Sequence, residues 1–119
     1  TTIDLGESWK EHPTSRRALV EPTCMASLHR HEYMEEGKKK SMLLFVNPNN
    51  YGTRDNLTLK VSFDDGMIWP EEHWILFDQY RSAGYSCITS IDENSIGILY
   101  ESSQSDLAFI KINLIEILK

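Results

Sequence analysis

Apolar and polar residues alternate strictly along residues 57–63. Side chains of a β-strand point alternately to its two faces, so this pattern predicts a strand with one buried face. The apolar set is Leu57, Leu59, Val61 and Phe63, and the polar set is Thr58, Lys60 and Ser62.

Several other short segments have the patterns of strands. The apolar run Ser41–Val46 is typical of a strand that is buried on both faces. Further strands are predicted at Leu19–Val20, Cys24–Leu28, Trp74–Phe77, Gly84–Ile91, Ser95–Tyr100 and Leu107–Ile112.

The segments between these strands are polar or charged. The cluster 92–94 predicts the turn of a hairpin, and the tail 113–118 predicts a helical turn. Residues 29–40 are predicted to form a charged loop, with Lys38–Lys40 at its solvated tip. About eight short strands with almost no helix predict an all-β sandwich, barrel or propeller.

One turn sequence occurs twice, at Thr2–Trp9 and at Ser62–Trp69. Both segments match Ser/Thr-x-Asp-x-Gly-x-x-Trp at every defined position and start 60 residues apart. The Asp can accept backbone N–H bonds while the Gly takes a positive φ, and the Trp can fold back as an apolar anchor. Two full matches, each followed by a strand-like segment, indicate a repeat. The strand that leads into the first copy is expected to precede residue 1.

Composition narrows the possible functions. A net charge of −6 argues against a nucleic-acid partner. The histidines His29 and His31 are spaced as metal ligands can be, but no carboxylate or Cys supports them, so no metal or other cofactor is expected. Cys24 and Cys87 are predicted to be buried free thiols, and a disulfide between them is left open.

These motifs together resemble the bacterial exo-α-sialidases, whose propeller blades carry this repeated turn, the Asp-box. The resembling segments are Glu21–Ser27, Asn47–Thr58, Gly84–Thr89 and Ile96–Glu101, in addition to the two turns. The resemblance implies a six-bladed β-propeller, with residues 1–119 forming the C-terminal part of the catalytic domain, about its last two blades. It also implies hydrolysis of terminal sialic acids from glycoconjugates with retention, no cofactor, and a secreted, periplasmic or cell-surface location.

Arg54 is the candidate substrate-binding residue. Sialic acid carries a carboxylate on its anomeric carbon, and the planar fork of arginine suits a carboxylate better than the point charge of lysine. Without the surrounding motif, a lone arginine in a loop is more often a solvated surface charge. The resemblance implies that Arg54 is one of three arginines that bind the substrate carboxylate.

Tyr85 is the candidate nucleophile. Gly84 and Ser86 flank it and leave room for a ligand close to the ring. A tyrosine in a strand is usually a packing residue, and the resemblance is what implies the catalytic role, since sialidases use a tyrosine nucleophile. A phenol arrives neutral and so avoids the repulsion that a carboxylate nucleophile would meet beside the substrate carboxylate.

Glu101 is the second candidate catalytic residue, at the end of the return strand of the predicted hairpin. The resemblance implies that it orients another arginine of the site, whereas the alternative is an exposed glutamate at a strand end. The acid/base Asp, the Glu that activates the tyrosine and two further arginines have no match in this chain.

The isolated chain is therefore predicted to be inactive. The alternative function is a non-catalytic Asp-box fragment that binds sialic acid or serves as a scaffold, and an unrelated β-sandwich is a further alternative. Because the open edges of a partial propeller favour association, the expected partners are other blades of the parent protein or another copy of the chain. Sialylated glycans are the expected substrates.

Overall fold

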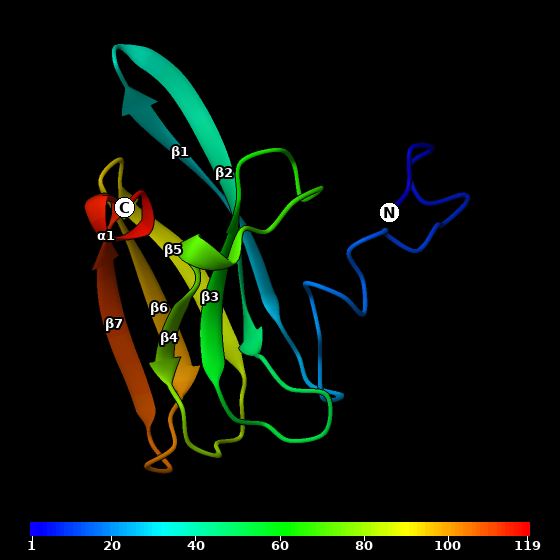
Figure 1. The fold of residues 1–119 in the computed structure, drawn as a ribbon, viewed down its shortest axis with the longest axis vertical. Helices are drawn as coiled ribbons and strands as arrows, with labels where there is room; N and C mark the ends of the chain where they lie inside the picture. Colours follow the sequence, from blue (N-terminus) through cyan, green and yellow to red (C-terminus); the bar gives the residue numbers. More distant parts are fainter.

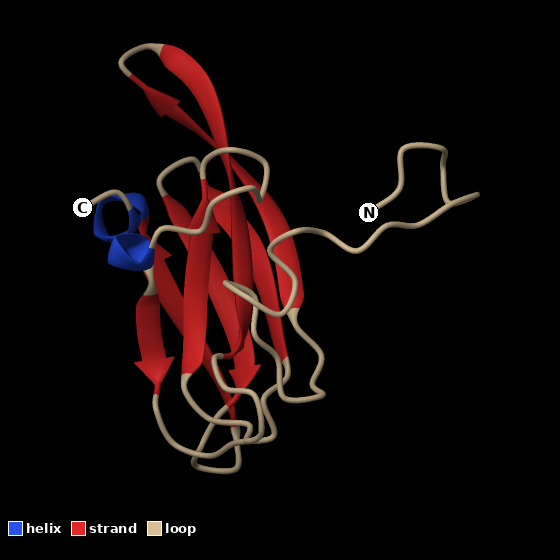
Figure 2. Ribbon diagram, turned by 45° about the vertical axis from the view of Figure 1, so that its right-hand side comes forward, coloured by secondary structure: helices blue, strands red, loops and turns tan.

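The computed structural model describes residues 1–119 and contains two antiparallel sheets (Figures 1 and 2). Neighbouring strands follow the order β1-β2-β3-β4 in one sheet and β5-β6-β7 in the other. The strands are β1 (Ser27–Glu35), β2 (Lys38–Pro48), β3 (Leu57–Ser62), β4 (Ile75–Asp78), β5 (Ser86–Asp92), β6 (Ser95–Glu101) and β7 (Leu107–Asn113). The all-β class is thus confirmed. Neither sheet closes into a barrel, and a four-stranded antiparallel sheet is the unit of a propeller blade, so the architecture is consistent with a partial propeller.

The predicted hairpin near the C-terminus is confirmed. Strands β5 and β6 pair with Ser86 opposite Tyr100. The carboxylate of Asp92 closes the turn, because it accepts bonds from the backbone N–H of Asn94 and the hydroxyl of Ser95, both at 2.8 Å. The predicted helical turn in the tail is confirmed as the helix α1 (Leu114–Ile117). None of the helices has the length and apolar character that a membrane span requires.

The predicted charged loop at residues 29–40 is wrong. These residues form a long hairpin of β1 and β2, and the chain turns at Glu36 and Gly37, which both have positive φ. Alternate residues face inward, and His31 and Tyr33 are buried. Charged side chains on both faces of this hairpin form cross-strand ion pairs instead of a solvated loop. These pairs join Lys39 to Glu32 at 2.8 Å and Lys40 to Glu35.

The N-terminal strand predictions are also corrected. Strand β1 begins only at Ser27, and Leu19 makes a single isolated bridge to Ser15. The predicted strand Leu19–Val20 is therefore absent, and most of the predicted strand Cys24–Leu28 is irregular backbone.

The hydrophobic core lies between the two sheets. Fourteen buried apolar residues form one cluster, which includes residues of β2, β3, β5, β6 and β7. Its fully buried members include Leu44, Leu57, Leu59, Ile96 and Ile98. Burying a side chain of this size contributes about 1.5–3 kcal/mol, so this cluster is the main force that holds the sheets together.

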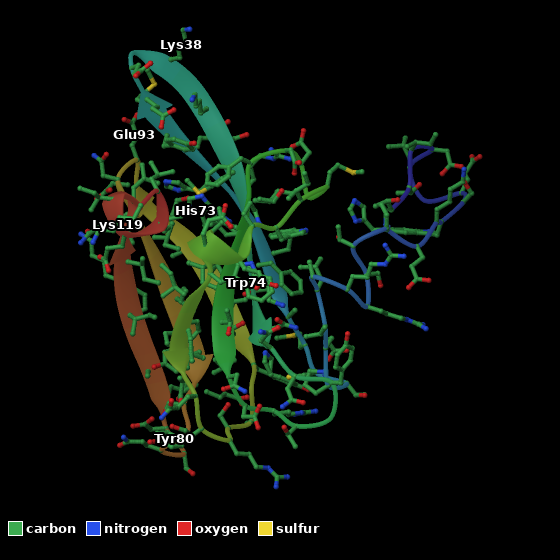
Figure 3. All side chains as sticks on the ribbon, in the orientation of Figure 1. Lys38, His73, Trp74, Tyr80, Glu93 and Lys119 are labelled. Carbon is green, nitrogen blue, oxygen red and sulfur yellow. The ribbon has the colours of Figure 1, made fainter.

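Both faces of β3 are buried, although the sequence predicted one. The apolar residues face the core, and the polar face is covered by residues 14–20 and by Trp74. The Nζ of Lys60 donates to the Ala18 carbonyl at 2.6 Å and lies 4.6 Å from the centre of the Trp74 ring. Lys60 is thus a fully buried cation, and Trp74 lies beside the sheet, as Figure 3 shows.

The two copies of the repeated turn have the same internal hydrogen bonds. In the second copy, the backbone N–H of Gly66 donates to the Ser62 hydroxyl at 2.8 Å, and that of Ile68 donates to the Asp64 carboxylate at 2.9 Å. The corresponding distances in the first copy are 2.9 Å from Gly6 to Thr2 and 2.9 Å from Ser8 to Asp4. In both copies the Gly has positive φ and its carbonyl accepts the Trp indole N–H, so the predicted turn chemistry is confirmed.

The two tryptophans of these turns have different surroundings. Trp69 is 5% exposed and contacts Phe45 edge to face. Trp9 is 72% exposed, and the N-terminal segment that carries it projects away from the sheets in Figure 1. Trp69 is therefore the apolar anchor that the sequence predicted, whereas Trp9 is not buried within this chain.

Candidate active site

The three residues predicted for the site lie at one end of the two sheets. Arg54 belongs to the loop between β2 and β3, Tyr85 directly precedes β5, and Glu101 ends β6. Figure 1 shows that the loops after β2, β4 and β6 gather at this end of the molecule, and Tyr80 lies there as well (Figure 3). Residues that are far apart in sequence thus share one surface.

Arg54 and Tyr85 are in contact. The guanidinium carbon of Arg54 lies 5.6 Å from the centre of the Tyr85 ring, within the range of a cation–π interaction. Arg54 is half-buried, whereas Tyr85 is 43% exposed. The tyrosine therefore has one side against the cation and another open to solvent.

The guanidinium of Arg54 also binds two backbone carbonyls. Its Nη1 donates to the Ala83 carbonyl and its Nη2 donates to the Thr23 carbonyl, both at 3.0 Å. An arginine has five N–H donors, so these two bonds leave three donors for a ligand. These partners could not be predicted from residue types, because every residue offers a backbone carbonyl.

Glu101 contacts the backbone of Tyr85. Its Oε2 accepts the Tyr85 backbone N–H at 3.0 Å, and its own backbone N–H donates to the Tyr85 carbonyl at 3.0 Å. The carboxylate thus fixes the chain at Tyr85, and no ion pair joins it to Arg54. Next to it is an open hollow of about 570 Å³, which is lined by residues that include Arg81, Ala83, Glu101 and Ser102.

The two cysteines are free, and neither is fully buried. Cys24 is half-buried beneath the site, where its Sγ lies 3.8 Å from the Ala83 carbonyl, and burial raises the pKa of its thiol. Cys87 is exposed, so the prediction of a buried thiol is wrong for this residue. Its side chain alternates outward from β5, away from the core.

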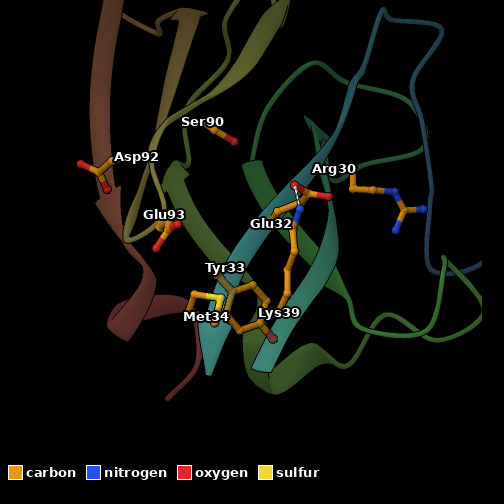
Figure 4. Close-up of a pocket in the computed structure, with 8 residues that line it drawn as sticks. All are labelled: Arg30, Glu32, Tyr33, Met34, Lys39, Ser90, Asp92 and Glu93. Atoms are coloured by element: carbon orange, nitrogen blue, oxygen red, sulfur yellow. Dashed lines mark ion pairs between the residues drawn. The ribbon is translucent and has the colours of Figure 1, made fainter. Parts of the chain in front are cut away.

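A second hollow lies at the opposite end, between the β1–β2 hairpin and the β5–β6 turn (Figure 4). It has a volume of about 630 Å³ and is rich in charged residues. Its cations are already paired within the chain, Lys39 with Glu32 and Arg30 with Asp65, both at 2.8 Å. These internal pairs leave no unpaired cation in this hollow that would indicate an anionic ligand.

The two histidines of β1 join the two sheets. His29 Nε2 and His31 Nδ1 each lie 2.8 Å from the hydroxyl oxygen of Ser90 on β5, and His31 Nε2 lies 3.1 Å from the Glu93 carbonyl. Burial and, to a smaller extent, the neighbouring His31 lower the pKa of His29. No group of three or more His, Cys, Asp or Glu residues is placed to hold a metal ion. The role of Ser90 could not be seen in the sequence, because one serine in a strand has no distinctive pattern.

Comparisons with known proteins agree with the resemblance to sialidases that the sequence motifs indicated. No protein-family model matches the chain. A sialidase of Bacteroides fragilis (strain YCH46) is 45% identical over 118 residues, which are 99% of this chain and 22% of that protein. A sialidase of Micromonospora viridifaciens is 32% identical over 90 residues, which are 74% of this chain and 13% of that protein.

A solved structure is similar as well. The Hadza microbial sialidase Hz136 superposes with a TM-score of 0.85 at 43% identity, covering 98% of this chain and 22% of that one. The chain thus spans about a fifth of the length of the Bacteroides fragilis sialidase and of Hz136. Nearly all of it is homologous to a segment of sialidases, which identifies the chain as a sialidase fragment.

Proposed function

We propose that this chain supplies part of the active site of a retaining exo-α-sialidase, with Tyr85 as the nucleophile and Arg54 as a ligand of the substrate carboxylate. The contact between the Arg54 guanidinium and the Tyr85 ring, at 5.6 Å, is the observation that carries the proposal. The names of the relatives support the same reaction class.

Each residue has a definite part in this reaction. The phenol oxygen of Tyr85 attacks the anomeric carbon as the bond to the leaving oxygen breaks, and water then displaces the tyrosine, so that two inversions give retention. The remaining N–H groups of Arg54 bind the sialoside carboxylate beside the ring. A proton donor for the leaving group and a base for the phenol come from segments outside this chain.

Glu101 holds the nucleophile through the backbone. Its Oε2 accepts the Tyr85 N–H, while its Oε1 has no hydrogen-bond partner in the chain. We propose that an arginine from the rest of the domain binds Oε1, so that one carboxylate fixes both the tyrosine backbone and a second cation. Such a pair fixes the angle of the guanidinium toward the substrate.

The remaining part of the protein is expected to cover the outer face of the β5-β6-β7 sheet. That face exposes Leu99, Leu107 and Phe109, which are 45%, 71% and 58% exposed. We propose that another blade packs on it, from the same longer protein or from another copy, and that the assembly acts on sialylated glycans outside the cell or at its surface.

A chimera tests the proposed function. The chain would replace the matching segment of the Bacteroides fragilis sialidase, and hydrolysis of an aryl sialoside would be measured for the chimera and for the isolated chain. We expect turnover by the chimera and none by the chain alone. Tyr85→Phe should lower kcat by about 100-fold or more, since it removes the nucleophilic oxygen, and Arg54→Ala should mainly raise KM.

Tyr80→Phe is the matched control, because Tyr80 is an exposed tyrosine at the same end of the sheets. It should leave both constants unchanged. Full activity of Tyr85→Phe would contradict the nucleophile assignment. A chimera that binds sialosides without hydrolysing them would instead favour a binding module.

A further inference from the structure

Three loops meet around the side chain of Arg54. The Thr23 and Ala83 carbonyls each accept one of its Nη groups at 3.0 Å, and the Arg54 carbonyl accepts the backbone N–H of Ser82 at 2.8 Å. These bonds connect the loop before β1, the loop between β2 and β3 and the loop before β5. The guanidinium is therefore held from two sides by fixed backbone atoms.

Gly84 has no side chain, and this allows the loops around Arg54 to pack closely. A Cβ at this position would lie 3.0 Å from Cys24 Sγ, 3.0 Å from Pro48 Cγ and 3.5 Å from Arg54 Cβ. The two distances of 3.0 Å are shorter than most real Cβ contacts, so Cys24 and Pro48 would have to shift, whereas 3.5 Å from Arg54 Cβ is an ordinary contact. Gly84 also has φ +93°, a conformation that side-chain-bearing residues rarely adopt.

Thr23 has an unusual backbone conformation as well. Its φ is +57°, in the left-handed region that threonine rarely enters because of its branched Cβ. The adjoining backbone N–H of Cys24 donates to the Glu21 carboxylate, which closes this loop on itself. The loop thus holds the Thr23 carbonyl where it meets Arg54, at the cost of local strain.

We propose that Gly84 and Thr23 are positioning residues that hold the Arg54 guanidinium against the Tyr85 ring. Gly84 acts by letting Cys24 and Pro48 pack closely beside the Arg54 loop, and Thr23 acts by directing its carbonyl at Nη2. The contribution of this arrangement to sialoside binding rests on the proposed function, whereas the arrangement itself does not.

Nuclear magnetic resonance of the isolated chain tests the arrangement without catalysis. Two hydrogen bonds to separate Nη groups hinder rotation of the guanidinium, so wild-type Arg54 should show resolved Nη1 and Nη2 signals. Gly84→Ala should merge these signals and shift those of the Tyr85 ring. Gly52→Ala is the matched control in the Arg54 loop, because a Cβ at Gly52 meets nothing within 4 Å, and it should leave both sets of signals unchanged.

A second pair of variants tests the Thr23 carbonyl. Thr23→Pro fixes φ near −65° and should merge the Arg54 signals, whereas Thr23→Gly permits the positive φ and should preserve them. Averaged Nη signals in the wild-type chain would overturn the proposal. Resolved wild-type signals that persist in Gly84→Ala and in Thr23→Pro would overturn it equally.

The chimera then shows whether the positioning matters for the reaction. In a correctly folded chimera, Gly84→Ala should raise KM for an aryl sialoside by about tenfold, with a smaller change in kcat, because a displaced Arg54 binds the carboxylate less well in substrate and transition state alike. An unchanged KM would refute this role of Gly84. If Tyr85→Phe remains active while Gly84→Ala still moves the Arg54 signals, the proposed function fails but the positioning role stands.

Discussion

Lys60 should make the chain more stable as the pH rises from 8 to 10.5. Its ammonium group is fully buried against the Trp74 ring and the Ala18 carbonyl. Burial lowers the pKa of Lys60 from 10.5 to about 8, although Glu71 partly offsets the effect. In this pH range the unfolded chain therefore binds a proton that the folded chain has released.

The size of the effect follows from the pKa difference. A pKa lowered from 10.5 to about 8 corresponds to about 3 kcal/mol of unfolding free energy. Below pH 8 both states are protonated, and folding bears the full penalty of burying the cation. As the pH rises through the window, the folded state loses its proton first, so this penalty is progressively removed.

The comparison with Lys60→Met isolates this contribution. Urea unfolding of both proteins would be followed by tryptophan fluorescence between pH 7 and 10.5. The unfolding free energy of the wild-type chain, minus that of the variant, should increase by about 3 kcal/mol over this range. Burial also raises the pKa values of Tyr33 and Tyr100. Their effects on stability are the same in both proteins and therefore cancel in this difference of unfolding free energies.

Lys38→Met is the control, because Lys38 is exposed at the tip of the β1–β2 hairpin (Figure 3). Its difference from the wild-type chain should not vary with pH. A flat difference for Lys60→Met would refute the view that Lys60 carries an uncompensated burial penalty.

The remaining predictions concern the repeated turns and the thiols. Trp69→Ala should lower the unfolding free energy by about 3–5 kcal/mol, whereas Trp9→Ala should change it by less than about 0.5 kcal/mol, because only Trp69 is packed. Urea titrations measure both, and equal losses would contradict this assignment. Exposed Cys87 should react with a disulfide reagent at pH 8 at least about tenfold faster than Cys24, whose thiol is half-buried with a raised pKa. Cys87→Ser should remove the fast phase, and a fast phase that persists would disprove the ranking.

Local patterns predicted the parts of the fold that depend on local chemistry. The β5–β6 hairpin follows from two alternating segments around Asp92, whose carboxylate closes the turn. The β1–β2 hairpin was missed because its outward residues are charged, and the pairing of Glu32 with Lys39 exists only once the strands are in register. Likewise, the burial of Lys60 depends on its contacts with the distant Ala18 carbonyl and the Trp74 ring.

The candidate site was likewise predicted only in part from the sequence. The identities and order of Arg54, Tyr85 and Glu101 were visible in the sequence, and the fold brings them to one end of the sheets. The carbonyls of Thr23 and Ala83 could not be predicted, since a backbone acceptor leaves no trace in residue type. Gly84 suggested only open space near Tyr85, because its closeness to Cys24 and Pro48 arises only in the folded chain.

The repeated turn has a consequence for how the chain folds. The copy at Thr2–Trp9 keeps its full set of internal bonds although its tryptophan is exposed, so the turn holds its shape without support from the core. A turn of this kind can form early, because all its contacts span only a few residues and closing so short a loop loses little chain entropy. In the second copy, the preformed turn brings the end of β3 and the start of the β4 segment close together before the sheet is complete. The second copy would then act as a folding nucleus for the β1-β2-β3-β4 sheet, in addition to its place in the finished structure.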